Sequence, residues 1–466
     1  MIISVIGSGG KTTKIKELKD QYISENKTVL ITTSTHMKIE EDTLVNPTYQ
    51  QIMSCINEKR YCHAGQLSEN NKITSLDHNL INQLKNEIDI ILIEADGSKG
   101  LPAKYPRNDE PVILPNTDTI ILITSFLALG KPIKDVIHGY EQFLNETNYN
   151  ENDLVTIFMI DQLIKIYLKK LAPMNKKILI QVNEANGLYQ KVMAKMIEEQ
   201  YDLSLINSNW FVAQPHLVIL GAGHVSQYVC QIAQLLDFYT IVIDDRIEFA
   251  NEKLFPEANE VHCIYYHDAQ RYFPNEKNTC FVIVTRGHKD DKLCLKKVID
   301  IESLYVGMIG SRKKVKKTFD DLLNEGYSQD LIKRVHAPIG LDIHAVTPGE
   351  IAISIMAEII DIKNKYQYSS ISKELLNVHQ DGVLCIITKK TGSTPRNVGS
   401  MMFVTQDTSI IGSIGGGSIE HQVILDALKT QHITKKHYEL NNSEGAKLGM
   451  ICGGSNDVLF IPLYFS

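Results

Sequence analysis

The sequence lacks the features of several large classes of protein. No apolar run is long enough to cross a bilayer, so we expect no integral membrane protein. The net charge of −7 gives no electrostatic reason to expect binding to nucleic acid or to an anionic membrane. The eight cysteines include no CxxC pair and no His/Cys cluster at zinc spacing, which favours the cytoplasm over a disulfide framework. The N-terminal stretch MIISVIGSGGKTT has neither the basic flank nor the cleavage site of a secretion signal.

The length and composition predict a globular protein of several domains. A chain of 466 residues exceeds one ordinary hydrophobic core, so we expect two to four domains. Hydrophobic residues make up 43% and charged residues 22%, which is ordinary for α/β proteins. We find no internal repeat and no low-complexity tract. The expected boundaries lie near Trp210 and Tyr366, which divides the chain into residues 1–209, 210–366 and 367–466.

Short apolar runs alternate with helical stretches through most of the chain. The first series is MIISVI, TVLITT, IDIILIEAD, DTIILIT and KKILIQVN, and the second is PHLVILGAG, TIVIDD, TCFVIVTRG and LYVGMIGS. Such alternation predicts two doubly wound α/β domains, each a parallel sheet covered on both faces. After the polar segment 361–374, hairpin-like strands with glycine-rich turns and a helix predict a smaller α+β domain.

The stretch VIGSGGKTTKIKELKDQY predicts a phosphate-binding turn. A strand, a glycine-rich turn and a helix follow one another in the order that lets backbone N–H groups cradle phosphates. Lys11 would reach the terminal phosphates of ATP or GTP, and Thr12 would hold Mg²⁺. The alternative is a tight turn with a chance lysine. The turn is shorter than the usual P-loop and resembles the loop of Mur ligases; its candidate residues are Gly7, Gly9, Gly10, Lys11, Thr12 and Thr13.

A second feature supports this P-loop-like site. The stretch IILIEADGSKG ends a hydrophobic strand with Glu94 and Asp96, where acids would orient magnesium or water. Taken alone, the two acids would be a solvated strand end. Beside the glycine turn, they complete the candidate nucleotide-binding set. Hydrolysis of the nucleotide stays open, and so does the question of whether the chain is an enzyme.

A second glycine turn, in LVILGAGHVSQ, predicts a dinucleotide-binding Rossmann domain. Gly221 permits the tight turn, Gly223 lets the backbone approach a pyrophosphate, and Asp244 ends the next strand where it would bind ribose hydroxyls. The Asp244 carboxylate argues against a dinucleotide that carries a 2′-phosphate, but the nearby Arg246 could accommodate one, so both kinds of dinucleotide stay open. A Rossmann fold that binds nothing is the alternative, and we find no hydride-transfer constellation. The candidate residues are Gly221, Gly223, His224, Asp244 and Arg246.

Longer motifs resemble known families. ILGAGHVSQ, VIDDRIEFANEKLFPEA, VTRGHKDD, VGMIGSRKKV and PIGLDIHAVTPGEIAISIMAEII resemble the Rossmann domain of the XdhC/CoxI family. TGSTPRNVGSMMFVT, IGSIGGGSIEHQVI and GMICGGSNDVLFIPL resemble the smaller domain of that family, which comes first in most members. VIGSGGKTT, VLITTSTHM and LIEADGSKGLPAKYPRNDEPVIL resemble YqeC, an accessory protein of selenium-dependent molybdenum hydroxylase systems.

The resemblance implies a maturation factor for a molybdenum hydroxylase of the xanthine dehydrogenase type. Such a protein would bind molybdenum cofactor (molybdopterin), assist its sulfuration or selenation and insert it into the apo-hydroxylase. The implied partners are the apo molybdenum hydroxylase and a sulfur or selenium donor protein. From the two glycine turns themselves, we expect ATP or GTP with Mg²⁺ in the first domain, and an NAD-like dinucleotide or the nucleotide-like part of the cofactor in the second. A homodimer stays open, and we assign no catalytic residue.

The stretch LGMICGGSND places Cys452 beside two glycines. Free cysteine is often a buried filler, but a thiolate is also a soft metal ligand, and spacing alone leaves both open. The resemblance favours a ligand role, although many family members carry cysteine where this chain has Ser418. A glycine turn before a helix and an arginine fork would take the pterin phosphate. The candidate cofactor-binding residues here are Arg396, Gly415, Gly416, Gly417, Cys452, Gly453 and Gly454; the candidate metal ligands are Thr12 and Cys452.

Three other functions compete with the maturation factor. An NAD-dependent oxidoreductase would use the second glycine turn. A molybdenum cofactor nucleotidyltransferase would need a GGxS-type loop, and the GGKTT at the N-terminus disfavours it. A non-catalytic scaffold would leave both glycine turns without a ligand.

Overall fold

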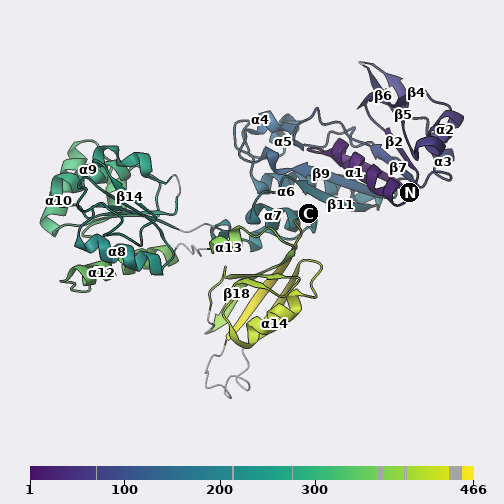
Figure 1. The fold of residues 1–466 in the computed structure, drawn as a ribbon. Helices are drawn as coiled ribbons and strands as arrows, with labels where there is room; N and C mark the ends of the chain where they lie inside the picture. The colour runs from purple at the N-terminus through teal and green to yellow at the C-terminus, as the bar shows by residue number, and fades with distance from the viewer. Residues whose placement is uncertain are drawn as a thin grey trace. The chain divides into compact units, whose positions relative to one another are not determined.

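The structure is a computed structural model that describes residues 1–69, 71–211, 215–274, 277–365, 371–392, 394, 396–439 and 454–465. The chain divides into two compact units. Figure 1 labels the helices and strands along the chain. Met1–Leu205 with Thr430–Thr434 and Ile461–Leu463 form the first unit, and most of the remaining residues form the second.

The first unit is built around a nine-stranded sheet with the order β11-β9-β1-β7-β2-β5-β6-β3, in which β4 also pairs with β5. The five strands predicted for this region are all present and pair in parallel, which confirms the prediction of a parallel sheet. They are β1 (Ile2–Gly7), β2 (Val29–Thr33), β7 (Ile90–Glu94), β9 (Thr119–Ser125) and β11 (Lys177–Asn183). Their side chains are mostly buried because helices cover the sheet, as a parallel arrangement requires.

Four further strands extend one edge of this sheet and were missed by the sequence analysis. They are β3 (Met37–Lys38), β4 (Thr43–Val45), β5 (Tyr61–Ser68) and β6 (Lys72–Thr74). The β5–β6 and β6–β3 pairs are antiparallel. Three of these strands are only two or three residues long, so they carry no apolar run that a sequence pattern would detect.

The helices of the first unit are amphipathic and pack on the sheet. The longer ones are α1 (Lys11–Ser24), α2 (Tyr49–Lys59), α3 (His78–Leu84), α6 (Ile157–Leu171) and α7 (Leu188–Glu198). In α6 the buried residues recur at helical spacing, and the Thr156 side chain caps the first turn. Shorter elements connect them: β8 (Ala103–Lys104), η1 (Phe126–Ala128), α4 (Ile133–Val136), β10 (Ile137–His138), α5 (Tyr140–Asn145), η2 (Ala172–Met174) and η3 (Leu203–Leu205).

The second unit contains a six-stranded, all-parallel sheet with the order β14-β13-β12-β15-β16-β17. This is the Rossmann order, in which the chain reverses direction across the sheet at the first strand. The four strands predicted here are confirmed. The strands are β12 (His216–Leu220), β13 (Tyr239–Asp244), β14 (Glu260–Cys263), β15 (Thr279–Ile283), β16 (Tyr305–Met308) and β17 (Val335–His336).

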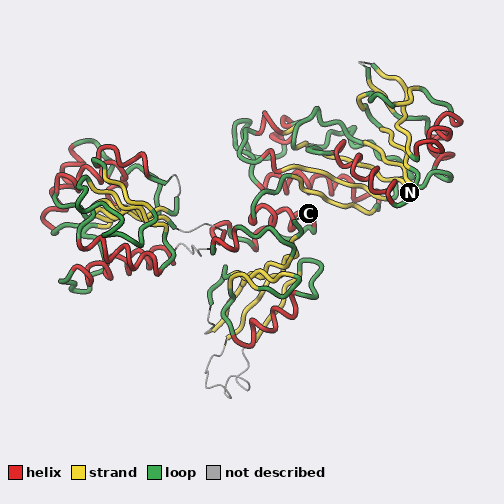
Figure 2. The backbone as a smooth tube through the Cα atoms, viewed as in Figure 1, coloured by secondary structure: helices red, strands yellow, loops and turns green. Residues whose placement is uncertain are grey.

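Helices cover both faces of this sheet (Figure 2). One hydrophobic core joins the sheet to α8 (His224–Leu235) and α12 (Pro348–Lys365), and the other joins it to α9 (His288–Val298) and α10 (Arg312–Asn324). The polar segment predicted as a linker or exposed helix begins as the last turn of α12. The remaining elements are η4 (Ser208–Phe211), η5 (Tyr266–Tyr272) and α11 (Gln329–Lys333).

The C-terminal part forms a five-stranded sheet with the order β20-β19-β18-β22-β21. The predicted hairpin strands and the following helix are confirmed as β18 (Gly382–Gly392), β19 (Met401–Thr405), β20 (Ile410–Gly412) and α14 (Gly417–Ala427). α14 packs on the sheet through a separate core. The other elements are α13 (Lys373–Leu376), β21 (Thr434–Glu439) and β22 (Gly454–Leu463).

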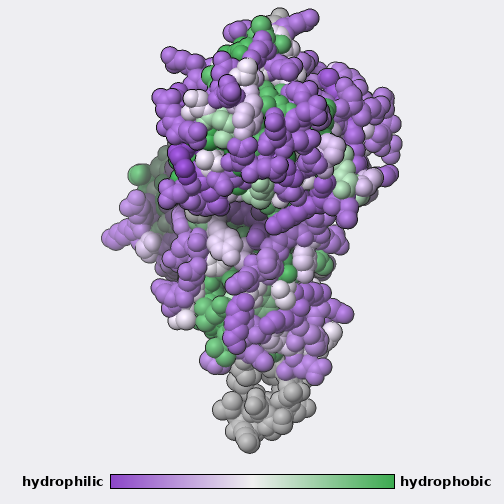
Figure 3. Space-filling view, turned by 90° about the vertical axis from the view of Figure 1, so that its right-hand side faces the viewer, coloured by the Kyte–Doolittle hydropathy of each residue, from purple (hydrophilic) through white to green (hydrophobic). Residues whose placement is uncertain are grey.

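Polar residues make up most of the face of the molecule that Figure 3 shows. Hydrophobic residues gather in separate patches on this face. Among the described residues, no helix combines the length and the apolar character needed to cross a membrane.

Candidate functional site

The first glycine turn joins the end of β1 to the start of α1. Gly7, Gly9 and Gly10 have φ values of 87°, 78° and 135°, in the region that side chains disfavour. A Cβ on Gly7 would lie 2.1 Å from the carbonyl oxygen of Ile123. The predicted glycines are therefore required by the backbone itself, and they let the turn lead directly into α1 at Lys11.

Lys11 is buried under this turn. Its Nζ donates hydrogen bonds to the Gly7 carbonyl at 2.8 Å and to Ser98 Oγ at 3.0 Å. Burial lowers the pKa of Lys11, while the nearby charges of Glu94 and Asp96 act in the opposite direction. The ammonium is thus held at the turn by two hydrogen bonds, one of them to Ser98 in the stretch IILIEADGSKG, a residue that the sequence analysis did not single out.

Thr12 and Glu94 face each other at the start of α1. Thr12 Oγ1 donates to Glu94 Oε2 at 3.4 Å, and Glu94 is the last residue of β7. Burial raises the pKa of Glu94, and the Lys11 charge opposes this shift. A hydroxyl and a carboxylate at this distance are oxygen donors of the kind that Mg²⁺ prefers. Thr12 and Thr13 are both exposed on the first turn of the helix.

Asp96 holds the turn from within the protein. It is fully buried, and its Oδ2 accepts from the Gly7 backbone N–H at 3.1 Å and from the Tyr167 hydroxyl at 2.6 Å. Its Oδ1 bonds the buried Lys104 ammonium, which also bonds Glu110. These contacts give Asp96 a structural role; its predicted part in orienting magnesium or water stays a prediction. The sequence analysis missed Tyr167, which lies outside every quoted motif, and it assigned no role to Lys104 within the YqeC-like motif.

A further contact to the turn comes from the end of β11. Asn183 Nδ2 donates to the Gly9 carbonyl at 2.9 Å, and Gln181 Nε2 donates to Asn183 Oδ1 at 2.7 Å. A Cβ on Gly10 would lie 2.4 Å from the same Asn183 amide nitrogen. The glycine turn is therefore packed between the ends of several parallel strands.

The second glycine turn joins β12 to α8. Gly221 has a φ of 115°, and a Cβ there would lie 2.4 Å from the Val284 carbonyl oxygen. Gly223 differs, because a Cβ there would meet no heavy atom of the described residues within 4 Å. The Ser226 hydroxyl, at the position of the third glycine, donates to the Gly221 carbonyl at 2.6 Å. His224 is exposed at the start of α8. Gly221 is thus needed for the fold, whereas Gly223 faces open space.

Asp244 is fully buried at the end of β13 and is bonded to this turn. Its Oδ2 accepts from the Ala222 backbone N–H at 2.8 Å, from Arg246 Nη2 at 2.8 Å and from the Tyr266 hydroxyl at 3.2 Å. Its Oδ1 accepts from Arg246 Nε at 2.8 Å. Burial alone would raise the pKa of Asp244, but the bonds from Arg246 and Ala222 outweigh it and lower the pKa to about 2. Arg246 is therefore engaged with the acid itself, and the predicted ribose contact stays a prediction.

The neighbouring residue Asp245 was not singled out in the sequence. Its Oδ2 accepts from Arg286 Nη2 at 3.2 Å. Its Oδ1 is buried and accepts no hydrogen bond from any part of the chain that the structure describes, with Arg246 Nε 4.0 Å away. An acidic oxygen of this kind beside the glycine turn is a second candidate for contact with a ligand hydroxyl.

The glycine turn of the C-terminal sheet leads into α14. The Glu420 carboxylate accepts from the Ile414 and Gly416 backbone N–H groups at 3.1 and 3.0 Å and from the Ser413 hydroxyl at 2.7 Å. These donors converge on one anionic group, which is the chemistry expected of a phosphate site. The positive φ values of Gly415, Gly416 and Gly417 confirm the predicted glycine turn. Arg396 is exposed.

Two candidate residues of this region lie outside the described residues: Cys452 and Gly453. Gly454 begins β22.

The strand orders and the two glycine turns define an α/β protein with a Rossmann fold in its second unit. Three families match successive parts of the chain: the family described as YqeC protein at residues 3–141, the XdhC Rossmann domain at 217–359, and the XdhC and CoxI family at 375–436. Successive parts of the chain are thus similar to YqeC and to the two parts of the XdhC and CoxI family, with the YqeC part ahead of the Rossmann part. This confirms the resemblance inferred from the sequence motifs.

Individual relatives agree with these assignments. Uncharacterized protein YqeB of Escherichia coli (strain K12) is 36% identical over 152 residues, covering 32% of this chain and 28% of that protein. Uncharacterized protein YqeC of the same strain is 30% identical over 154 residues, covering 31% and 60%. A probable xanthine dehydrogenase subunit of Bacillus subtilis (strain 168) is 26% identical over 152 residues, covering 33% and 44%. The chain thus spans between 28% and 60% of the length of these relatives.

Proposed function

We propose that this chain is an accessory protein of a xanthine dehydrogenase-type molybdenum hydroxylase. The XdhC-type families that match the chain, and the relative named as a xanthine dehydrogenase subunit, support this role. In this proposal the chain binds molybdenum cofactor, assists its sulfuration or selenation, and delivers it to the apo-hydroxylase in the cytoplasm. A sulfur or selenium donor protein is the second partner.

The first glycine turn binds ATP or GTP with Mg²⁺ in this proposal. The observation that carries it is the grouping of Lys11, Thr12 and Glu94 where the turn enters α1. The Lys11 ammonium would exchange its bond to Ser98 for phosphate oxygens. Thr12 and Glu94 supply oxygen atoms for the magnesium ion or its waters.

The second glycine turn takes a dinucleotide or the nucleotide-like part of the cofactor. The open space at Gly223 supports this, because a pyrophosphate must approach the backbone closely there. Asp245 offers an acceptor for a ribose hydroxyl in addition to the predicted Asp244.

The C-terminal part presents the cofactor through Cys452 and the turn before α14. The donors that bind the Glu420 carboxylate suit an anion, so the phosphate of the cofactor would replace this carboxylate. Thiolate sulfur is a soft ligand for the metal end of the cofactor. In this proposal the three functions belong to three domains, with boundaries near Trp210 and Tyr366.

The test is a single cysteine substitution in the full chain, made in cells that synthesise the cofactor. We expect Cys452→Ser to abolish co-purifying pterin and molybdenum and to lower the activity of the co-expressed hydroxylase. Cys263→Ser is the matched control, because Cys263 is a free, exposed thiol of the Rossmann sheet. Unchanged cofactor content and hydroxylase activity in Cys452→Ser would contradict the ligand role. Steady-state reduction of nicotinamide by the wild-type chain would support an oxidoreductase instead.

A further inference from the structure

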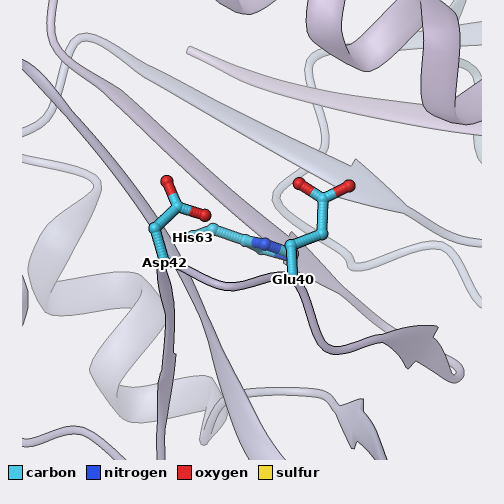
Figure 4. A group of neighbouring side chains, drawn as sticks. All are labelled: Glu40, Asp42 and His63. Atoms are coloured by element: carbon cyan, nitrogen blue, oxygen red, sulfur yellow. The ribbon is translucent and has the colours of Figure 1, made fainter.

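Three potential metal ligands gather beside α1 in the first unit. Glu40, Asp42 and His63 each offer one ligand atom, and these atoms lie within 4.8 Å of one another. Figure 4 shows the imidazole between the two acidic side chains. The two acids precede β4, and His63 lies on β5; the parallel register aligns Thr43 with His63 and so brings the acids to the ring.

The contacts of His63 indicate which of its two ring nitrogens carries the proton. His63 is 4% exposed, and its Nε2 lies 3.0 Å from Met37 Sδ. A thioether has no proton to donate, so this contact is a hydrogen bond only when Nε2 carries the proton. Nδ1 then accepts from the Thr43 hydroxyl at 2.9 Å, and the oxygen of that hydroxyl accepts from the Glu40 backbone N–H at 2.9 Å.

With the Nε2 proton directed at Met37 Sδ, the lone pair of Nδ1 is the one available to a metal ion. A neutral imidazole whose other nitrogen is held by a hydrogen bond is the usual state of a metal-ligating histidine.

The two carboxylates are already paired with donors at the surface. The Asp42 Oδ2 accepts from the Tyr61 hydroxyl at 2.7 Å, and Glu40 Oε1 forms an ion pair with Lys16 Nζ at 2.8 Å. The Lys16 side chain is 53% exposed, so its ammonium can move into solvent with little loss of buried contact. The Lys16 ammonium thus occupies the place on the Glu40 carboxylate that a metal ion would take.

The same residues line a small cavity of about 50 Å³, together with Thr12, Met37 and Tyr61. Such a volume accommodates an ion with one or more water molecules, given that a single water needs roughly 10–15 Å³ of this kind of space. One imidazole nitrogen and two carboxylate oxygens are a ligand set used by Zn²⁺ and related borderline cations, with water in the remaining position.

We propose that Glu40, Asp42 and His63 form a binding site for a divalent transition-metal ion of the Zn²⁺ type. The ion replaces the Lys16 ammonium on Glu40 and the Thr43 hydroxyl on His63 Nδ1. This site uses other ligands than the proposed magnesium site at Thr12 and Glu94, although Thr12 also lines its cavity.

The test is calorimetric titration of the chelator-treated full chain with ZnCl₂. We expect Asp42→Asn and Glu40→Gln to weaken Zn²⁺ binding by about tenfold or more, a typical loss when a metal site loses one of its partners. Glu40 lies at the surface, so its substitution leaves the fold intact even if Asp42→Asn does not. Lys16→Gln should instead strengthen binding several-fold, because it removes the competing ammonium.

The control is Lys19→Gln. Lys19 lines the same cavity, but its ammonium pairs with Asp20 at 3.2 Å and not with the metal ligands. It should leave the Zn²⁺ affinity unchanged, which separates competition at Glu40 from a general effect of positive charge. Zn²⁺ affinity and stoichiometry that are equal in wild type, Asp42→Asn and Glu40→Gln, or a wild type that binds no Zn²⁺, would overturn the proposal.

Discussion

The Gly7 backbone N–H donates a 3.1 Å hydrogen bond to Asp96 Oδ2, across 89 residues of sequence. This bond ties the glycine turn after β1 to the loop after β7, the strand beside it in the sheet. Since Tyr167 and Lys104 bind the same carboxylate, the shape of the first glycine turn depends on a buried polar network.

The network should stabilise the first unit. Tyr167→Phe removes the 2.6 Å bond to buried Asp96 and should lower the free energy of unfolding by about 1–3 kcal/mol. Lys104→Met leaves Asp96 and Glu110 without their shared cation and should cost about 3–5 kcal/mol. Urea denaturation followed by circular dichroism measures both changes.

A surface tyrosine provides the control for this network. Tyr49→Phe removes a similar hydroxyl–carboxylate bond, to Glu87, in an exposed position, and should change stability much less than Tyr167→Phe does. If Tyr49→Phe and Tyr167→Phe lower the free energy of unfolding equally, burial of the Asp96 network adds nothing to stability.

Lys11→Ala should weaken binding of ATP or GTP by roughly tenfold or more, because it removes charge-assisted bonds to phosphate. Lys14→Ala is the matched control: Lys14 lies one turn further along α1 and pairs with Glu17 at 3.4 Å. Isothermal titration calorimetry with Mg²⁺ present measures both variants. The phosphate role of the turn is wrong if wild type and Lys11→Ala bind both nucleotides equally.

The two glycines of the second turn should respond differently to substitution. Gly223→Val should keep the thermal stability of wild type, since its side chain meets open space, but lose stabilisation by dinucleotides because it blocks the pyrophosphate. Gly221→Ala should lower the melting temperature, because its Cβ meets the Val284 carbonyl at a φ of 115°. Thermal unfolding with and without NAD measures both effects. If NAD still raises the melting temperature of Gly223→Val, the pyrophosphate does not bind at the Gly223 backbone.

The stability of the Rossmann part should depend on the protonation of Asp291. Burial raises the pKa of Asp291 from its ordinary 3.8 to about 6, although hydrogen bonds from Thr285 oppose the shift. Between these pH values the folded state binds a proton that the unfolded state has released. Raising the pH from about 4 to 6 therefore destabilises the folded state through this group, with no further change above about 7.

The comparison with Asp291→Asn isolates that effect. The asparagine can still accept from Thr285 but does not titrate, so other groups cancel in the difference between the two proteins. Wild-type stability minus that of Asp291→Asn, from urea denaturation, should fall as the pH rises from 4 to 6. A constant difference across this range would contradict the raised pKa.

Strands and glycine turns were determined by the sequence itself. Runs such as IISVIG and HLVIL are short, apolar and bounded by turns, so they form buried parallel strands wherever they occur. The turn at Gly7 could be predicted because positive φ values select glycine locally. The short strand β4 escaped prediction because its pairing with β5, and not its own composition, makes it a strand.

The roles of the polar side chains were decided only by the tertiary structure. Glu94 and Asp96 stand two residues apart, yet Glu94 meets Thr12 while Asp96 is buried against Gly7 and Tyr167. No local pattern encodes such a difference, because it arises from burial and from donors brought in by distant strands and helices. His63 shows the same principle: alone in the sequence it is one histidine among fifteen, and only the pairing of β4 with β5 brings carboxylates to its ring.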